Sequence, residues 1–177
     1  NDLYDIYHDY EGMNNIKTIN DNAGIQPVKV DEEIIELLKL GITMDEKTDG
    51  NMNIAMGSVL SIWHDYREAG SEDPYSAELP PMDELERAAE HTDIHNIVID
   101  EEASTVYLTD PDMSLDVGSI GKGYAVQKVA EYAKNELGIR YMLFSVGGNV
   151  CAIGGHPDGS AWAVGIQNPD VESDQAY

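Results

Sequence analysis

The stretch from Asp116 to Val126 constrains the fold and chemistry of this chain more than any other. It reads Asp-Val-Gly-Ser-Ile-Gly-Lys-Gly-Tyr-Ala-Val. It joins a short apolar run to a helical pattern, so we expect a glycine-rich turn between a strand and a helix. Such a turn can present backbone N–H groups and the positive end of a helix to an anion. Ser119 adds a hydroxyl, Lys122 a cation and Asp116 a carboxylate, a set that suits a phosphate with a divalent cation.

The common nucleotide-binding motifs do not describe this stretch. A Walker loop carries Ser or Thr after its lysine, whereas Gly123 follows Lys122 here. The glycine order, G-x-x-G-x-G, also differs from the dinucleotide fingerprint G-x-G-x-x-G. Glycines at the end of a strand often form only a tight turn, so a turn without a ligand remains an alternative to a phosphate site.

The charge balance excludes several classes of partner. The 177 residues include 34 Asp and Glu but only 10 Lys and Arg, which gives a net charge of −24. We do not expect so acidic a chain to bind nucleic acid or an anionic lipid surface. If it binds a pyrophosphate, the scarcity of cations favours a bound metal over a site built from lysines. The single cysteine, Cys151, lies in an apolar run, which indicates a buried structural thiol and excludes an internal disulfide.

The order of periodic segments predicts an α+β fold with an antiparallel-rich sheet and packed helices. The predicted helices cover residues 3–12, 32–47, 81–91 and 124–137. The predicted strands cover residues 27–30, 97–99, 105–108, 141–146, 150–153 and 162–166. We expect residues 97–99 and 105–108 to form one hairpin and residues 150–153 and 162–166 another. The near-continuous apolar strand 141–146 is expected to be buried on both faces.

Residues 53–63 are expected to begin in an extended conformation and then to pack their large apolar side chains inward. Those side chains are Val59, Leu60, Ile62 and Trp63. The polar residues that follow are expected at a solvated helix end; they are His64, Asp65 and Arg67. Two further histidines, His91 and His95, have no third metal ligand at motif spacing, so we predict no metal site there.

Four stretches, in order, resemble the ApbE-type FAD:protein FMN transferases. Residues 116–125 resemble the family signature D-(L/I/V)-(G/S)-(A/G/S/T)-(I/V)-(A/G)-(K/E)-G-Y-A. The other three are Asn53-Ile-Ala-Met-Gly-Ser-Val-Leu-Ser-Ile-Trp63, Ser145-Val-Gly-Gly-Asn149 and Pro157-Asp-Gly-Ser-Ala-Trp-Ala-Val-Gly-Ile-Gln-Asn-Pro169. The resemblance implies one α+β (T-fold-like) domain over residues 1–177, truncated at both ends. The expected leader is missing, as are later segments that supply a flavin-contacting histidine and further metal ligands.

The resemblance also implies a set of site residues. FAD contacts fall on Ala55, Met56, Gly57, Asp116 and Lys122, and Ser119 supplies a metal-ligand oxygen. An aromatic ten residues before Asn20 stacks on the flavin ring in the family, which points to Tyr10; an ordinary amphipathic tyrosine is an equal alternative. No residue is identified as catalytic, because no paired base stands at motif spacing to Ser119.

The implied activity is Mg²⁺-dependent transfer of the FMN moiety of FAD onto a threonine of an acceptor flavoprotein, with release of AMP. The acceptor would be an exported flavoprotein such as a redox-pump subunit. By resemblance, the full-length protein would be extracytoplasmic and anchored to the membrane as a lipoprotein. The alternative is a flavin-binding carrier, or an Mg²⁺-dependent FAD pyrophosphatase without transfer to protein. A purely structural acidic domain is a third alternative.

Overall fold

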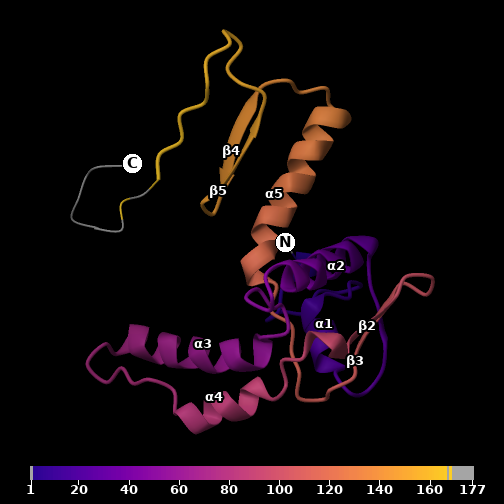
Figure 1. Cartoon of the computed structure of the whole chain (residues 1–177), viewed down its shortest axis with the longest axis vertical. Coiled ribbons are helices and arrows are strands. Elements are labelled where there is room, and N and C mark those ends of the chain that lie inside the picture. The colour runs from indigo at the N-terminus through magenta and orange to yellow at the C-terminus, as the bar shows by residue number, and fades with distance from the viewer. Residues whose placement is uncertain (1, 167, 169–177) are drawn as a thin grey trace. The chain divides into compact units, whose positions relative to one another are not determined.

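The computed structural model describes residues 2–166 and residue 168 of the chain (Figure 1). The chain forms two compact units, the first ending at Gly121 and the second beginning at Lys122. Within the described residues, no helix is both long enough and apolar enough to span a membrane. Helices combine with antiparallel sheets, which confirms the predicted α+β class.

The first unit contains a three-stranded antiparallel sheet in the order β1-β3-β2. Its strands are β1 (Val28–Lys29), β2 (Ile97–Asp100) and β3 (Thr105–Leu108). The predicted hairpin is confirmed, because β2 pairs with β3 from Ile97 opposite Leu108 to Asp100 opposite Thr105. The turn between these strands places Ser104 at φ 54°, and the N–H of Ala103 donates to the side chain of Asp100.

Helices precede β1 in the sequence and also lie between β1 and β2. They are η1 (Asp2–Tyr4), α1 (Ile16–Asp21), α2 (Glu32–Lys47), α3 (Gly57–Glu72), α4 (Met82–Ala89) and η2 (Ile94–Asn96). Helices α2 and α4 confirm two of the predictions. Helices α3 and α4 pack against each other, as Figure 1 shows. The buried core of the unit includes Ile34, Leu37 and Leu38 of α2 together with Ile54, Val106, Leu108 and Leu115.

The helix predicted over residues 3–12 is wrong, because only the single turn η1 forms there. The carboxylate of Asp5 accepts the backbone N–H groups of Tyr7 and His8, which a continuing helix would have bonded to carbonyls. Tyr10 and Met13 then form an isolated antiparallel bridge around Gly12, whose φ is 77°. The apolar spacing in this segment therefore reflects a folded loop.

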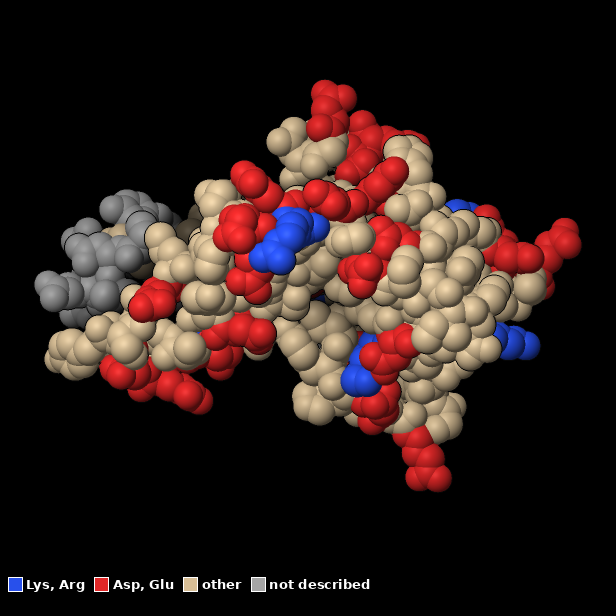
Figure 2. Space-filling model, turned by 90° about the horizontal axis from the view of Figure 1, so that it is seen from below, with Lys and Arg blue, Asp and Glu red and all other residues tan. Residues whose placement is uncertain are grey.

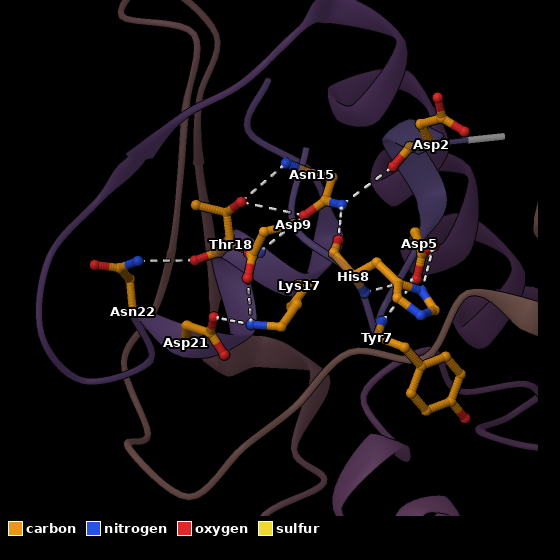
Figure 3. Close-up of polar contacts among 10 residues, drawn as sticks. All are labelled: Asp2, Asp5, Tyr7, His8, Asp9, Asn15, Lys17, Thr18, Asp21 and Asn22. Carbon is orange, nitrogen blue, oxygen red and sulfur yellow. Dashed lines mark hydrogen bonds and ion pairs between the residues drawn. The ribbon is translucent and has the colours of Figure 1, made fainter. Parts of the chain in front are cut away.

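Asn15 ties that loop to the start of α1, as Figure 3 shows. Its side chain is fully buried. The Asn15 amide donates to the carbonyls of Asp2 and His8, and its oxygen accepts the N–H of Thr18. The Thr18 hydroxyl in turn accepts the N–H of Asn15. This reciprocal capping box begins a six-residue helix that would be marginal alone.

The segment after Asn53 departs from its predicted conformation. It enters helix α3 at Gly57 instead of extending, and of the four residues expected to pack inward only Val59 is buried. Leu60 and Trp63 remain 40% and 42% exposed. Val59 lies on the helix face toward the core, whereas Leu60 and Trp63, three residues apart, share another face.

The second unit contains most of helix α5 (Gly118–Asn135) and a hairpin of β4 (Met142–Val146) and β5 (Asn149–Ile153). The two-residue turn Gly147-Gly148 has positive φ at both positions, which is the geometry that tight hairpins favour. The predicted pairing of residues 150–153 with 162–166 is therefore wrong: β5 pairs with β4, and 162–166 form no strand. The end of the fourth family-like stretch, Gln167 and Pro169, lies outside the described residues.

One face of this hairpin packs on α5 within the second unit. Ala130 and Ala133 of the helix form a core with Ile153, against which Met142, Phe144 and Cys151 pack. The opposite face has no such layer among the described residues, and Ser145 and Val150, which lie on it, are exposed. The prediction that strand 141–146 is buried on both faces is thus wrong, and Cys151 is half-buried. Gly138 ends the helix region at φ 65°, as predicted.

Candidate functional site

Residues 114–116 form an extended strap held from both sides within the first unit. On one side, the N–H of Gly57 donates to the carbonyl of Ser114 (3.0 Å) and the N–H of Asp116 donates to the carbonyl of Ile54 (2.9 Å). On the other side, the Asn20 side chain accepts the N–H of Leu115 (2.8 Å) and donates to its carbonyl (3.0 Å). The position of Asp116 is therefore fixed by segments far away in the sequence.

A cavity of about 520 Å³ opens beside this strap, within the range typical of small-molecule sites. The residues that line it come from the N-terminal loop, helix α3, the α3–α4 connection and the strap. They are Tyr7, Leu60, Trp63, His64, Tyr66, Arg67, Gly70, Ala77, Glu78, Leu79 and Asp116. Aromatic rings and leucines dominate this set, and such walls suit a flat ring system.

One wall of the cavity is a contact between Tyr7 and His64. Their ring centroids are 5.2 Å apart and the planes are tilted by 33°. The Arg67 guanidinium lies 2.6 Å from Nδ1 of His64. Because arginine can only donate, Nδ1 must be the acceptor, and the neutral ring carries its proton on Nε2. In Figure 3 the Tyr7 ring points away from the polar cluster around Asn15.

The electrostatics of the cavity reflect the acidity of the chain. Figure 2 shows acidic side chains spread over the visible face with few basic ones between them. Among the lining residues, Glu78 and Asp116 are acidic and Arg67 is the one Lys or Arg. Burial raises the pKa of the Tyr7 phenol, and the negative charge of Asp116 raises it further. The Tyr7 phenol is therefore uncharged at neutral pH.

The glycine-rich stretch differs from the predicted turn. Helix α5 begins at Gly118, so all three glycines lie inside the helix, and none of them has positive φ. The Asp116 carboxylate accepts the N–H of Gly118 (2.7 Å) and caps the first turn. The glycines are thus not needed for a left-handed turn at this place.

The donor set at the start of α5 fits part of a magnesium site. Asp116 is half-buried at the cavity edge and Ser119 is exposed, so both present oxygens to solvent. Mg²⁺ commonly takes one or two protein oxygens together with waters and substrate phosphates. Asp116 and Ser119 are compatible with that role. The exposed Lys122 belongs to the second unit, where its side chain lies near Gly147.

The remaining predicted contacts lie away from the cavity lining. Ala55 is fully buried, and its N–H donates to the side chain of Asn53. Gly57 is buried against Ser114, and its absent side chain allows the close approach of the strap. The Tyr10 hydroxyl donates to Asp5 (2.7 Å), which raises the pKa of Tyr10 to about 12. Met56 is half-buried next to Gly57.

Sequence reasoning missed Tyr7, His64 and Arg67. The prediction of a helix end at His64 and Arg67 is wrong, because α3 continues to Glu72. Arg67 is solvent-exposed, as predicted, and both residues line the cavity. The available signal was their spacing of three residues, which places side chains on one face of a helix. Tyr7 precedes Tyr10 by the same spacing, and only the structure distinguishes them.

A separate polar group joins the end of α4 to the loop after β3. His91, Asp110 and Asp112 bring ligand-type atoms within 4.8 Å of one another. His91 Nδ1 lies 2.9 Å from a carboxylate oxygen of Asp110. That carboxylate raises the pKa of His91, and the histidine lowers the pKa of Asp110. An ion pair between His91 and Asp110 accounts for the close approach of these two side chains. His95 pairs instead with Asp93.

The α+β fold carries an aromatic-lined cavity of a size typical of small-molecule sites, and sequence comparison identifies the family of the chain. The chain belongs to the ApbE family, whose sequence model matches residues 1–177. The FAD:protein FMN transferase of Escherichia coli (strain K12) is 25% identical over 162 residues, covering 90% of this chain and 44% of that protein. The enzyme of the same name from Treponema pallidum is 29% identical over 167 residues, covering 87% and 44%. The chain thus spans about half the length of these relatives.

Solved structures agree with the fold. The ApbE protein of Thermotoga maritima superposes with a TM-score of 0.72 at 28% identity, covering 91% of this chain and 49% of that one. The flavin transferase ApbE of Vibrio cholerae gives a TM-score of 0.70 at 22% identity, covering 92% and 50%. Because its identity is only 22%, the similarity to the Vibrio cholerae structure supports the fold alone.

Proposed function

We propose that the protein containing this chain is an FAD:protein FMN transferase, and that the cavity beside Asp116 receives the flavin ring. One observation carries the proposal: Asp116, from the signature stretch of the family, stands at the edge of an aromatic cavity of about 520 Å³. A planar isoalloxazine suits walls made of Tyr7, Trp63 and Tyr66. The names of the relatives support the activity.

In this proposal Tyr7 forms a wall of the flavin site, and the family resemblance predicts Tyr10 as the ring that stacks on the flavin. Tyr7 lines the cavity and is 55% exposed, so one face of its ring is available. The Tyr10 hydroxyl is engaged by Asp5. The family resemblance further supports the backbone of residues 55–57 and the side chains of Asp116 and Lys122 as contacts for the rest of FAD.

The proposed reaction is a phosphoryl transfer. The bond between the FMN phosphorus and the bridging oxygen breaks, a new phosphorus–oxygen bond forms to a threonine hydroxyl of the acceptor, and AMP leaves with the bridging oxygen. The hydroxyl proton passes to a base that the sequence does not identify. Asp116 and Ser119 would hold Mg²⁺, which supplies neutralisation of phosphate charge when bound. Lys122 would add a counter-charge in this acidic chain.

The proposal extends to partner and location through resemblance alone. The acceptor would be an exported flavoprotein such as a redox-pump subunit. The transferase would act outside the cytoplasm, held to the membrane by a lipid anchor. Nucleic acid is not a proposed partner, because a net charge of −24 opposes it.

The test uses the full-length protein with FAD, Mg²⁺ and a candidate acceptor. We expect the acceptor mass to rise by one FMN unit, with AMP released in equal amount. Replacing the acceptor threonine with valine should abolish both. AMP release without acceptor labelling would identify an FAD pyrophosphatase, and stoichiometric FAD retention without AMP a carrier; either result would overturn transfer as the activity.

A pair of matched variants tests the location of the flavin ring. Tyr7→Ala should weaken FAD binding by about tenfold, since a lost aromatic contact is worth on the order of 1 kcal/mol or more. Tyr75→Ala removes a fully exposed tyrosine that does not line the cavity, and FAD affinity should stay unchanged. Equal losses in the two variants would place the ring elsewhere.

A further inference from the structure

The connection between helices α3 and α4 holds an apolar side chain in solvent at the cavity. The connection covers residues 73–81 and lies at the ends of the two helices that point away from the sheet (Figure 1). Leu79 lines the cavity and is nevertheless 79% exposed. It forms an apolar rim with Leu60 and Trp63, two exposed side chains that line the same cavity from α3. Exposed apolar side chains gathered in one place indicate an interaction site, whereas scattered ones do not.

The backbone on both sides of Leu79 is held in place. Ala77 lies so close to Gly70 of α3 that a Cβ added to the glycine would stand 3.2 Å from the Ala77 Cβ. Pro80 is buried, and a residue that precedes proline is confined to extended conformations. Because the connection is already ordered, burying Leu79 against a partner costs little backbone entropy.

An acidic stretch surrounds the apolar rim. Residues 68–86 include seven Asp and Glu and no Lys or Arg. Ion pairs engage Glu68 and Asp83 near the two ends of this stretch. Glu72 and Glu78 lie between them, are exposed, and form no ion pair within the part of the chain that the structure describes. Such a surface attracts polypeptides rich in Lys and Arg and repels acidic ones.

We propose that the apolar rim and the acidic stretch together bind the segment of the acceptor protein that carries the threonine. The inference rests on the proposed function, because the partner is the acceptor of FMN. The proposed reaction takes place beside Asp116, which lines the same cavity as Leu79, so an acceptor that reaches the phosphate passes over the rim. A cavity of about 520 Å³ is roughly 8–10 Å across, a distance that about three residues of extended chain span. The acceptor segment therefore carries an apolar side chain about three residues from its threonine, with Lys or Arg close by.

The test uses the full-length protein saturated with FAD and Mg²⁺, and three fluorescein-labelled peptides of equal length with one central threonine. The first peptide has a leucine three residues to each side of the threonine and four flanking lysines. The second replaces the leucines with serines, and the third replaces the lysines with glutamates. Fluorescence anisotropy should show the first peptide binding at least tenfold more tightly than either of the others, because it alone offers both apolar burial and opposite charge. Failure of the first peptide to bind, or equal affinities for all three, would overturn the proposal.

Two variants locate the binding surface. Leu79→Ser should weaken binding of the first peptide by about tenfold and hardly affect the serine peptide, which lacks the apolar contact. Glu78→Gln should weaken binding of the first peptide by about threefold at low ionic strength, and added salt should reduce this loss. Its matched control is Glu102→Gln, which removes an exposed acid from the β2–β3 turn and should have a smaller effect. Unchanged peptide affinity in Leu79→Ser, or equal losses in Glu78→Gln and Glu102→Gln, would overturn the proposal.

The same variant distinguishes an acceptor from two other occupants of the apolar rim. Since Leu79 is exposed, Leu79→Ser should leave the urea midpoint of the full-length protein unchanged. A lower midpoint would show that the protein covers the rim with its own chain. Weaker FAD binding with unchanged peptide affinity would show that part of FAD covers it. Either result would overturn the proposal.

Peptide binding and FMN transfer are measured separately, so the two proposals can fail separately. If no acceptor receives FMN but the first peptide binds in a manner that depends on Leu79, the proposed transferase function is wrong and the apolar rim is still a binding site for basic segments. If an acceptor protein receives FMN with the same KM in Leu79→Ser as in the wild type, the rim does not bind the acceptor and the transferase function stands.

Discussion

Replacing Asn20 with alanine should destabilise the first unit strongly for so small a change. The Asn20 side chain makes two hydrogen bonds to the backbone of Leu115, which is 1% exposed. Each buried polar group left without a partner costs roughly 1–3 kcal/mol. Because Asn20 is only half-buried, water can reach part of the site, so we expect a loss of about 2–4 kcal/mol from the free energy of unfolding. Urea denaturation of the full-length protein, monitored by circular dichroism, measures this loss.

A second substitution at the same position separates hydrogen bonding from volume. Asn20→Asp keeps an acceptor for the N–H of Leu115 but sets a carboxylate against its carbonyl. The deficit relative to wild type should shrink as pH falls and the introduced carboxyl gains a proton to donate. Asn14→Ala, which removes one exposed bond to Lys29, should cost about 0.5 kcal/mol or less. A loss of similar size in Asn20→Ala and Asn14→Ala would refute the reasoning.

Further variants probe other contacts in the first unit. Gly57→Ala should lower the melting temperature, because a Cβ there would stand 2.6 Å from the Ser114 carbonyl oxygen and overpacking costs about 1–3 kcal/mol. Asn15→Ala should lose about 2 kcal/mol or more in urea denaturation, since it removes a capping box and leaves buried groups unpaired. The stability difference between wild type and His91→Gln should be largest between about pH 4 and pH 6.5. It should fall above that window as His91 loses its proton and below it as Asp110 gains one, since the His91 pKa is raised and the Asp110 pKa lowered. An unchanged melting temperature, an unchanged urea midpoint or a pH-independent difference, respectively, would contradict these predictions.

The sequence predicted the elements whose signals are local. Helix α4 follows Pro81 and carries acids in its first turn, and the β2–β3 hairpin is bounded by polar turn residues. The prediction of an N-terminal helix was wrong because the Asp5 side chain accepts the backbone N–H groups that a helix would bond to carbonyls. The spacing of apolar residues carries no information about this local competition. The predicted pairing of residues 150–153 with 162–166 was wrong because the Gly147-Gly148 turn brings β4 alongside β5 instead.

The candidate site was harder to predict than the elements around it. Asp116 could be chosen from its motif, and it lies at the cavity. Tyr7 and His64 meet across more than fifty residues of sequence, and nothing local indicates that contact. The bonds between Asn20 and the strap join positions 95 residues apart. Such distant pairings are set by tertiary packing, which single-residue patterns do not encode.

The bond between Asn20 and Leu115 also has a consequence for biosynthesis. At about 5–20 residues per second, a ribosome needs roughly 5–20 s to add the 95 residues that separate them. For most of that interval, until Thr105–Leu108 has been added, the nascent chain carries helix α1 without the β3 strand against which it packs. Ile16 and Ile19, fully buried in the finished fold, are then accessible to chaperones. Translation speed between these positions therefore sets how long the growing polypeptide is vulnerable to aggregation.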